Sequence, residues 1–269
     1  ALCQMQTCND KAANLDKAAG MITEAAGKAD LLVLPEIFNA PYQTDLLAGY
    51  AEPVPGPTTA MLSALARQHR LLLVGGSIPE QGENGHIYNT SCIFAPDGTM
   101  LGRHRKLHLF DIDIPGRIAF KESDVFTPGD DLQTFVYDDL AFAVIICYDI
   151  RFPHLYRQLA KTGAAMIAVP AAFTVPTGEA HWETLLRARA IETGAFILAP
   201  AQGGTHEDGR RTWGRSTVVG PWGEIVAKAD HDDPCVVPAT LDLTAVARAR
   251  AAVPALTHDR DFSPVLDPS

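Results

Sequence analysis

The fold is decided by the stretch AFAVIICYDIRFP, residues 141–153. Its first six residues are apolar and suit a buried β-strand, and Pro153 is a favourable first residue for a helix. Cys147 stands between these two elements, at a turn where backbone N–H groups are free to face a ligand. Such a turn suits a nucleophile, but cysteine is also among the most buried residue types. By itself, the stretch leaves Cys147 open as either a nucleophile or a core residue.

Short apolar runs alternate with helical patterns on both sides of this stretch. We expect buried strands at residues 2–5, 31–34, 71–76, 134–137, 141–146, 166–170, 196–200 and 236–241. Helices are predicted after an Asn9 cap, from a Thr58 cap to His69, and at residues 153–161, 179–192 and near 243. Turns rich in proline and glycine predict two hairpins, at residues 87–103 and 217–228. This pattern predicts a layered α/β fold with mixed sheets, and a single domain over residues 1–269 because no linker divides the chain.

The composition excludes several classes of partner. The chain has 269 residues and a formal net charge of −10, which argues against nucleic acid and anionic membranes as partners. No apolar run approaches the roughly 18 residues that a membrane-spanning helix requires. The five cysteines are odd in number, scattered, and without a C-x-x-C pair. That usage fits a reducing cytoplasm better than a disulfide framework, so a cytoplasmic location is expected.

Three reactive side chains follow apolar runs at the ends of predicted strands. They are the carboxylate of Glu36, the ammonium of Lys106 and the thiol of Cys147. Charged residues at such positions are seldom fully buried without partners. Neighbouring strands of one sheet would place the three ends on one rim, within reach of each other. Each residue alone could be an ordinary loop or core residue, and only the combination indicates a catalytic group.

The segments around these residues resemble the three signatures of the nitrilase, or carbon–nitrogen hydrolase, superfamily. They are LPE at 34–36, RKLHLF at 105–110 and ICYDIRFP at 146–153, in the order and spacing of the family. Further segments resemble its amidase branch: FDIDIPG at 110–116 with Glu122-Ser123, AFTVPTGEAHWE at 172–183 and GRSTVVGPWG at 214–223. These pieces span nearly the whole chain. The resemblance implies a four-layer α-β-β-α sandwich with mixed sheets and a Glu-Lys-Cys hydrolase.

The resemblance also implies a covalent mechanism. The Cys147 thiol is expected to attack an amide carbonyl and expel ammonia, which leaves a thioester. Glu36 is expected to accept the thiol proton, to protonate the leaving amine and then to activate water. Lys106 and the backbone N–H of Tyr148 would stabilise the tetrahedral oxyanion. This chemistry produces a carboxylic acid and requires no cofactor.

Glu122 is the fourth catalytic candidate. It lies in residues 111–131, which show little periodicity and are predicted as a long loop, and ordered loops of this length are often functional. The resemblance implies that a second glutamate in this loop hydrogen-bonds the lysine and helps to position substrate. The alternative is an exposed loop acid.

Several other residues are candidates for the wall of a substrate pocket. Arg151 could clamp a substrate carboxylate, because a guanidinium matches that geometry, or it could pair structurally with Asp149 near the turn. Tyr42, in the proline- and glycine-rich loop 39–57, is a further candidate, as are Thr174 and His181. Trp182 is expected to pack in the core.

Other kinds of site find little support. His104 and His108 have i, i+4 spacing, but the residues around them predict a strand end and a loop, and no H-E-x-x-H motif is present, so no metal is expected. The glycine pairs at 75–76 and 203–204 lack the lysine and hydroxyl residue of a phosphate loop. A Cys-His pair through His154 or His181 is conceivable, but it leaves Glu36 and Lys106 without a role.

Within the family, the chain most resembles the deaminated glutathione amidases and the neighbouring ω-amidases. Their substrates are small amides with carboxylate and keto groups, so a deaminated glutathione-like amide is expected first. α-Ketoglutaramate, an N-carbamoyl amino acid and a catalytically silent binding subunit are the alternatives. Arg215 departs from the family, in which histidine is common there, and this leaves specificity near the second hairpin open. The family usually forms dimers through a helical face, so a homodimer or higher homo-oligomer is expected, with residues 153–161 and the C-terminal tail contributing.

Overall fold

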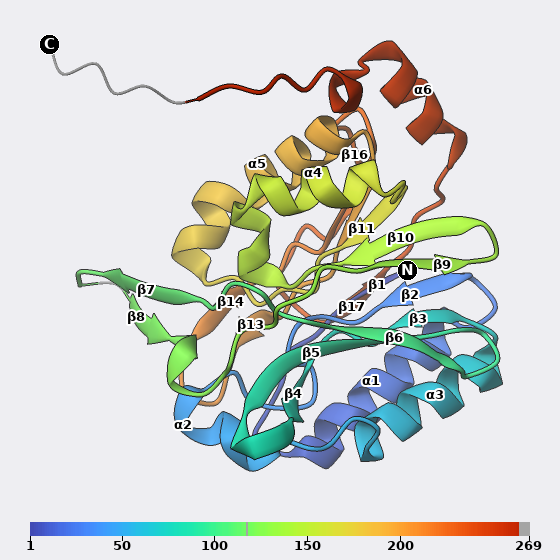
Figure 1. Cartoon of the computed structure of the whole chain (residues 1–269). Coiled ribbons are helices and arrows are strands. Elements are labelled where there is room, and N and C mark those ends of the chain that lie inside the picture. The colour runs from blue at the N-terminus through green and yellow to red at the C-terminus, as the bar shows by residue number, and fades with distance from the viewer. Residues whose placement is uncertain (117, 264–269) are drawn as a thin grey trace, which may run out of the picture.

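Two β-sheets lie face to face between two layers of helices in the computed structural model, which describes residues 1–116 and 118–263 (Figure 1). α1 (Lys11–Ala25) and α3 (Pro57–His69) cover one sheet. α4 (Pro153–Lys161) and α5 (Val175–Thr193) cover the other. The predicted α-β-β-α sandwich with mixed sheets is confirmed. Two further helices, α2 (Thr44–Leu47) and α6 (Thr244–Ala252), lie outside these layers.

The first sheet contains seven strands in the described part of the chain. They are β1 (Leu2–Gln4), β2 (Leu31–Val33), β3 (Leu72–Val74), β4 (Ile78–Gln81), β5 (Ile87–Phe94), β6 (Met100–Arg105) and β17 (Cys235–Val237). The order is β17-β1-β2-β3-β5-β4, and β6 also pairs with β5. β2 is parallel to β3, and two antiparallel pairings through β5 return β6 to the same direction. The carboxyl ends of β2 and β6 therefore lie at the same edge.

The second sheet repeats this arrangement with six strands among the described residues. They are β9 (Thr134–Tyr137), β10 (Leu140–Val144), β11 (Met166–Ala168), β12 (Phe196–Ala199), β15 (Thr217–Val219) and β16 (Ile225–Lys228), in the order β16-β15-β12-β11-β10-β9. β10, β11 and β12 are parallel, and antiparallel strands flank them. The mixed character follows from the hairpins, because two-residue to four-residue turns can only join antiparallel strands.

Apolar residues on both faces of each sheet hold the layers together. Alternate residues of a strand point to opposite faces, so Leu32 packs against α1 and α3 while Val33 faces the second sheet. In the second sheet, Val144 faces inwards and Ile145, just beyond β10, packs under α4 and α5. Strands that are buried on both faces need nearly continuous apolar sequence, which explains the unbroken runs in this chain.

Several predicted boundaries are wrong by a few residues. Asp10, not Asn9, caps α1, since its Oδ1 accepts hydrogen bonds from the backbone N–H groups of Ala12 at 2.9 Å and Ala13 at 3.3 Å. Gly56, not Thr58, is the cap of α3, and Pro57 is its first residue. α5 begins at 175 rather than 179, and the last strand is only β17. These errors arise because several neighbouring polar residues can cap a helix, and tertiary contacts select one of them.

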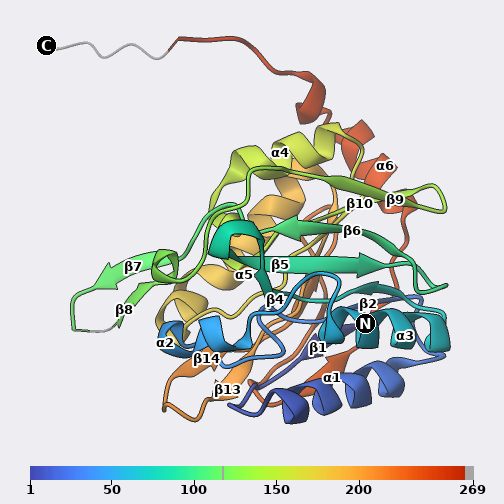
Figure 2. The same cartoon turned by 60° about the horizontal axis from the view of Figure 1, so that its bottom comes forward.

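Three short pairings were missed. The segment 111–131, predicted as a loop, contains the hairpin of β7 (Asp111–Ile114) and β8 (Ile118–Lys121), and β13 (Gly203–Thr205) pairs with β14 (Arg211–Trp213). β4 adds an edge strand to the first sheet. Figure 2 shows the β7–β8 hairpin projecting from the same end of the sandwich as α2 and β14. Strands of three or four residues carry too few positions for a periodic signal.

No helix in the described ranges, 1–116 and 118–263, is both long enough and apolar enough to cross a membrane.

Candidate active site

The candidate catalytic residues meet where the carboxyl ends of strands from both sheets come together. Glu36 follows β2, and Lys106 follows β6 directly, so both belong to the first sheet. Cys147 follows β10 of the second sheet and begins the 3₁₀ turn η4 (Cys147–Arg151). The expectation that neighbouring strands of one sheet bring the three together is therefore wrong. The facing of two sheets does so instead, because each layer contributes one part of the site.

The Lys106 ammonium lies between two carboxylates. Its Nζ is 2.8 Å from Glu36 Oε1 and 2.8 Å from Glu122 Oε2. The side chains of all three residues are fully buried. A buried ion pair is costly unless further hydrogen bonds satisfy it, so a cation with two buried carboxylates marks a site that the fold has built deliberately around charge. The prediction that Glu122 contacts the lysine is matched by this geometry, and Glu122 is not an exposed loop acid.

Asn89 completes this cluster, and the sequence did not reveal it. Its Nδ2 donates to Glu36 Oε1 at 2.9 Å and to Glu122 Oε1 at 3.0 Å. The backbone N–H of Phe110 also donates to Glu122 Oε2 at 2.6 Å. Asn89 lies on β5 within the predicted hairpin, where an asparagine carries no signal of function. A buried polar residue in an otherwise apolar strand is the only hint that it offers.

Cys147 sits in a strained turn. It is 4% exposed, and its φ of 46° places a non-glycine residue in the left-handed region. The backbone N–H of Cys147 donates to the Pro170 carbonyl at 2.9 Å, which ties the turn to the end of β11. Strain of this kind persists only where surrounding contacts enforce it, and such residues cluster at functional sites.

The segment that carries Glu36 is held equally tightly. Ile37 has a φ of 46°, and its N–H donates to Ser77 Oγ at 2.9 Å. Gln202 Nε2 donates to the Glu36 carbonyl at 2.6 Å. Gly76 allows this close packing, because a Cβ at that position would lie 2.1 Å from the Pro35 carbonyl oxygen. The carboxylate of Glu36 is thus positioned by contacts from both halves of the chain.

Burial dominates the acid–base properties of the cluster. Burial raises the pKa of Glu36, Lys106 opposes the rise and the nearby Glu122 charge adds to it. Burial also raises the pKa of Cys147 well above its ordinary value, with the Glu36 charge adding and Lys106 opposing. Burial alone would lower the pKa of Lys106, but its two carboxylate partners outweigh this and raise it. The free site therefore holds a protonated thiol, a charged lysine and a carboxylate with increased affinity for a proton.

The residues predicted for the pocket wall lie in two groups. The Tyr42 hydroxyl lies 3.4 Å from Glu36 Oε1 and 3.5 Å from Lys106 Nζ, inside the catalytic cluster. Arg151 and His181 lie together, with His181 Nδ1 at 3.3 Å from Arg151 Nη2. The Arg151 guanidinium carbon is 5.7 Å from the centre of the Tyr148 ring. Thr174 precedes α5, and its hydroxyl contacts Thr177 at 2.9 Å.

Two of the alternatives from the sequence can be placed as well. His181 contacts Arg151 and His154 packs on Phe152, and in the described residues neither imidazole hydrogen-bonds Cys147. Within the same residues no group of three or more His, Cys, Asp or Glu side chains is arranged to hold a metal ion. Trp182 is buried as predicted, and its Nε1 donates to the Arg215 carbonyl at 3.0 Å.

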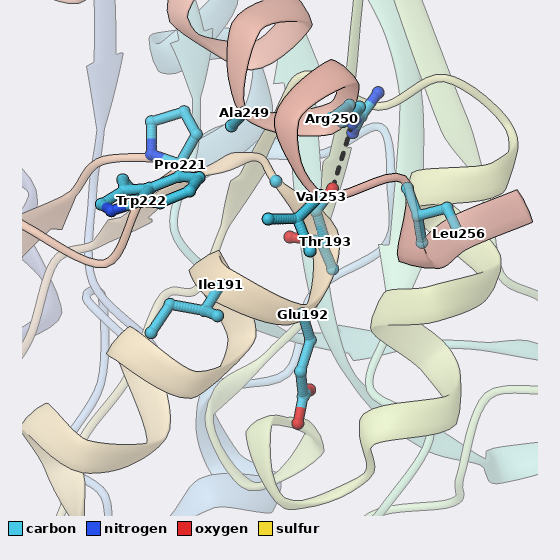
Figure 3. Close-up of a pocket in the computed structure, with 10 residues that line it drawn as sticks. Ile191, Glu192, Thr193, Pro221, Trp222, Ala249, Arg250, Val253 and Leu256 are labelled. Atoms are coloured by element: carbon cyan, nitrogen blue, oxygen red, sulfur yellow. Dashed lines mark hydrogen bonds between the residues drawn. The ribbon is translucent and has the colours of Figure 1, made fainter. Parts of the chain in front are cut away.

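An open cavity of about 450 Å³ adjoins the cluster at Tyr42. Its lining comes from the segments before α2 and α5, from β8 and from β13–β14 with their turn: Tyr42, Gln43, Phe110, Ala119, Phe120, Ala172, Thr174, Val175, Pro176, His206, Gly209, Arg210, Arg211 and Thr212. A second cavity, of about 270 Å³, lies between the end of α5, the β15–β16 turn and α6 (Figure 3). Its walls include Trp222 and Val253 but none of the catalytic candidates. The first cavity is the one that can admit a substrate to the cluster.

The fold and the buried Glu-Lys-Cys cluster together define a thiol-containing hydrolase of the nitrilase superfamily. The sequence model of the carbon–nitrogen hydrolase family matches residues 1–251. The chain therefore belongs to the carbon–nitrogen hydrolase family, and it is an enzyme of the amidase class.

Similar proteins point the same way. The chain is 44% identical to omega-amidase NIT2-B of Xenopus laevis over 252 residues, which cover 93% of this chain and 91% of that protein. Nit3 of Saccharomyces cerevisiae, a member of branch 10 of the nitrilase superfamily, superposes with a TM-score of 0.87 at 36% identity, over 97% of this chain and 96% of that one. An amidase from Nesterenkonia sp. AN1, solved with acrylamide added at its active-site cysteine, gives a TM-score of 0.78 at 26% identity, over 94% and 96% of the two chains.

Proposed function

We propose that this enzyme hydrolyses a small amide that carries a carboxylate, through a thioester on Cys147. The observation that carries the proposal is the buried lysine held at 2.8 Å from each of two carboxylates, beside a buried thiol in a strained turn. The addition of acrylamide to the active-site cysteine of the Nesterenkonia amidase supports a nucleophilic role for the corresponding thiol here.

The mechanism begins with a proton transfer inside the cluster. As the Cys147 sulfur bonds to the amide carbon, its proton passes to Glu36, whose raised pKa suits a base that must later act as an acid. Lys106 and the Tyr148 N–H would stabilise the oxyanion, and the loss of one such donor typically costs about 2.7–4 kcal/mol of barrier. When the C–N bond breaks, Glu36 returns the proton to nitrogen and the amine leaves. Water, deprotonated by Glu36, then attacks the thioester, which releases the acid and regenerates the thiol.

An ω-amide of a short dicarboxylic acid is the substrate class that the relatives favour. The similarity to omega-amidase NIT2-B extends over nearly the full length of both chains. Arg151 can serve the second carboxylate of such a substrate, since its guanidinium lies beside Tyr148 and Phe173 and contacts only the neutral-capable imidazole of His181 among the described hydrogen-bond partners. α-Ketoglutaramate is the first compound to test.

A substituted amide of the deaminated glutathione type is the second candidate. The two candidates share an acyl group but differ in what leaves: a terminal carboxamide releases ammonia, whereas deaminated glutathione would release cysteinylglycine. The cavity of about 450 Å³ beyond Tyr42 favours the larger leaving group, because ammonia needs no such space.

The proposal is tested by product analysis on wild-type enzyme and on Cys147→Ala. We expect wild-type enzyme to release ammonia from α-ketoglutaramate, the dipeptide from deaminated glutathione, or both, and to show an acyl adduct on Cys147 by intact mass. The Cys147→Ala variant should show neither product nor adduct. Product release by Cys147→Ala at the wild-type rate would refute the mechanism. Carbon dioxide from an N-carbamoyl amino acid would identify that class instead, and no release from any short amide would favour a silent binding subunit.

We further propose that two copies associate through the face formed by α4 and the C-terminal segment. Arg157 and Lys161 of α4 both pair with Asp259, which lays this segment along the helix. Close by, Trp222 is 64% exposed and Val253 is 56% exposed at the cavity in Figure 3. Apolar side chains this exposed often mark an interface. Light scattering should give at least twice the mass of the 28.9 kDa chain, and a monomer at micromolar concentration would exclude the pairing.

A further inference from the structure

The cavity beside the catalytic cluster has a floor of aromatic rings. The ring centres of Tyr148 and Phe110 are 5.3 Å apart, and those of Phe110 and Phe120 are 5.8 Å apart. Tyr42, whose hydroxyl contacts Glu36 and Lys106, packs on Phe120 with ring centres 5.2 Å apart. The row therefore runs alongside the catalytic cluster, from the turn after Cys147 to the β7–β8 hairpin.

A guanidinium lies at each end of this row. Arg151 lies 5.7 Å from the centre of the Tyr148 ring, and Arg210 lies 5.6 Å from the centre of the Phe120 ring. Two cations separated by three rings make a slot whose ends attract anions and whose middle is apolar. The scissile amide would lie between the two ends, where the catalytic cluster faces the row.

Arg210 is fixed in place but retains donors for a ligand. Its Nη2 donates to the Tyr42 carbonyl and its Nε pairs with Asp208. A guanidinium has five N–H donors, so these contacts leave Nη1 free in the hydrogen bonds that the described residues make. Because it is held by the residue that also contacts Glu36, Arg210 lies about one tyrosine side chain away from the catalytic carboxylate.

The neighbouring Arg211 differs from Arg210. It also lines the cavity, but its Nη2 pairs with Asp232 at 2.8 Å and its side chain is 58% exposed. Its charge is therefore directed to Asp232, outside the row of rings. This makes Arg211 a matched control, with the same charge at the adjacent position.

We propose that Arg210 binds a second carboxylate, carried by the amine part of a substituted amide substrate. Arg151 would bind the carboxylate of the acyl part, so the substrate spans the aromatic row with an anion at each end. A dipeptide leaving group fits this distance, since two extended residues span roughly 7 Å. The inference rests on the proposed amidase function and adds the class of leaving group: a short peptide with a free C-terminal carboxylate.

The test compares two amides of α-ketoglutarate that differ only at the far end. One is the γ-amide with cysteinylglycine, and the other is the same compound with a C-terminal carboxamide in place of the carboxylate. For wild-type enzyme we expect kcat/KM to favour the carboxylate roughly 10- to 100-fold, the range that one charged hydrogen-bonded contact provides. Arg210→Ala should abolish this preference, Arg210→Lys should keep part of it, and Arg211→Ala should keep it whole.

Binding measurements separate the possible failures. In the Cys147→Ala background, calorimetry should show the same preference for the carboxylate compound without turnover. Equal affinity for both compounds, or equal losses for both on Arg210→Ala, would overturn the inference and leave Arg210 only a support for Tyr42. If wild-type enzyme hydrolyses α-ketoglutaramate but neither dipeptide amide, the inference fails while the proposed function stands. If it hydrolyses none of the three, the proposed function fails, and unequal binding by Cys147→Ala would still support the carboxylate site.

Discussion

The carboxylate of Asp149 accepts two hydrogen bonds from His108, one from its backbone N–H at 2.9 Å and one from its imidazole Nδ1 at 2.8 Å. The same carboxylate accepts from the backbone N–H of Ile146 at 3.2 Å. One buried side chain thus ties the residue before Cys147 to the loop after Lys106, and it links the two sheets at the site. Burial alone would raise the pKa of Asp149, but the imidazoles of His104 and His108 lower it from the ordinary 3.8 to about 2.

Asp149→Asn is expected to lower the free energy of unfolding by about 2 kcal/mol at pH 7, the value of the pKa shift converted at 1.36 kcal/mol per unit. Because the folded-state pKa lies below the unfolded one, this stability is complete above pH 4 and is lost as the pH falls towards 2. Urea unfolding at neutral and acidic pH measures the difference, with exposed Asp16→Asn as the control. A loss that persists unchanged at low pH would show that geometry, not charge, is responsible.

Lys106→Met is expected to destabilise the protein by roughly 3–5 kcal/mol, because it leaves two buried carboxylates without their cation. The loss should be smaller at acidic pH, where one carboxylate can take up a proton. The double variant Lys106→Met/Glu122→Gln should recover much of the stability, since it removes one of the two charges. Denaturant titrations of the three proteins test this, and no recovery in the double variant would contradict the pairing as its cause.

Glu122→Gln is expected to move the acidic limb of the kcat/KM profile to lower pH. The charge of Glu122 raises the pKa of Glu36, so its removal lets that pKa fall and the base remains ionised in more acidic solution. Initial rates across the acidic range measure the shift. The exposed Glu83→Gln variant is the control and should keep the wild-type profile. A lower rate without any movement of the limb would mean that Glu122 only positions Lys106.

Arg151→Ala is expected to raise KM for a carboxylate-bearing amide by roughly 10- to 100-fold, with a smaller change in kcat, since a charged hydrogen bond to a ligand is lost. The same substitution should hardly affect an uncharged amide such as butyramide. Arg248→Ala, which removes an exposed arginine paired with Asp242 on α6, serves as the control. Equal effects on charged and uncharged amides would assign Arg151 a structural role.

Much of the architecture could be predicted from local pattern. The run 141–146 is a strand, with β10 and the two residues that follow it, because six apolar residues suit burial on both faces. Pro153 begins α4 as predicted, since proline fixes φ and lacks the N–H that a first helical residue leaves unpaired. The three signature segments also indicated the family, because they hold the reactive residue types in a fixed order. These features depend on residues close together in sequence.

The sequence by itself thus determined the strands, the helices and the identity of the reactive side chains at Glu36, Lys106 and Cys147. Only the tertiary structure decided that Cys147 meets the other two across facing sheets, that Asn89 bridges Glu36 and Glu122, and that an aromatic row separates Arg151 from Arg210. Local pattern records which face of an element is apolar, but many pairings of such faces bury similar apolar area. The choice among them comes from the packing of side chains far apart in the chain, which no single stretch of sequence contains.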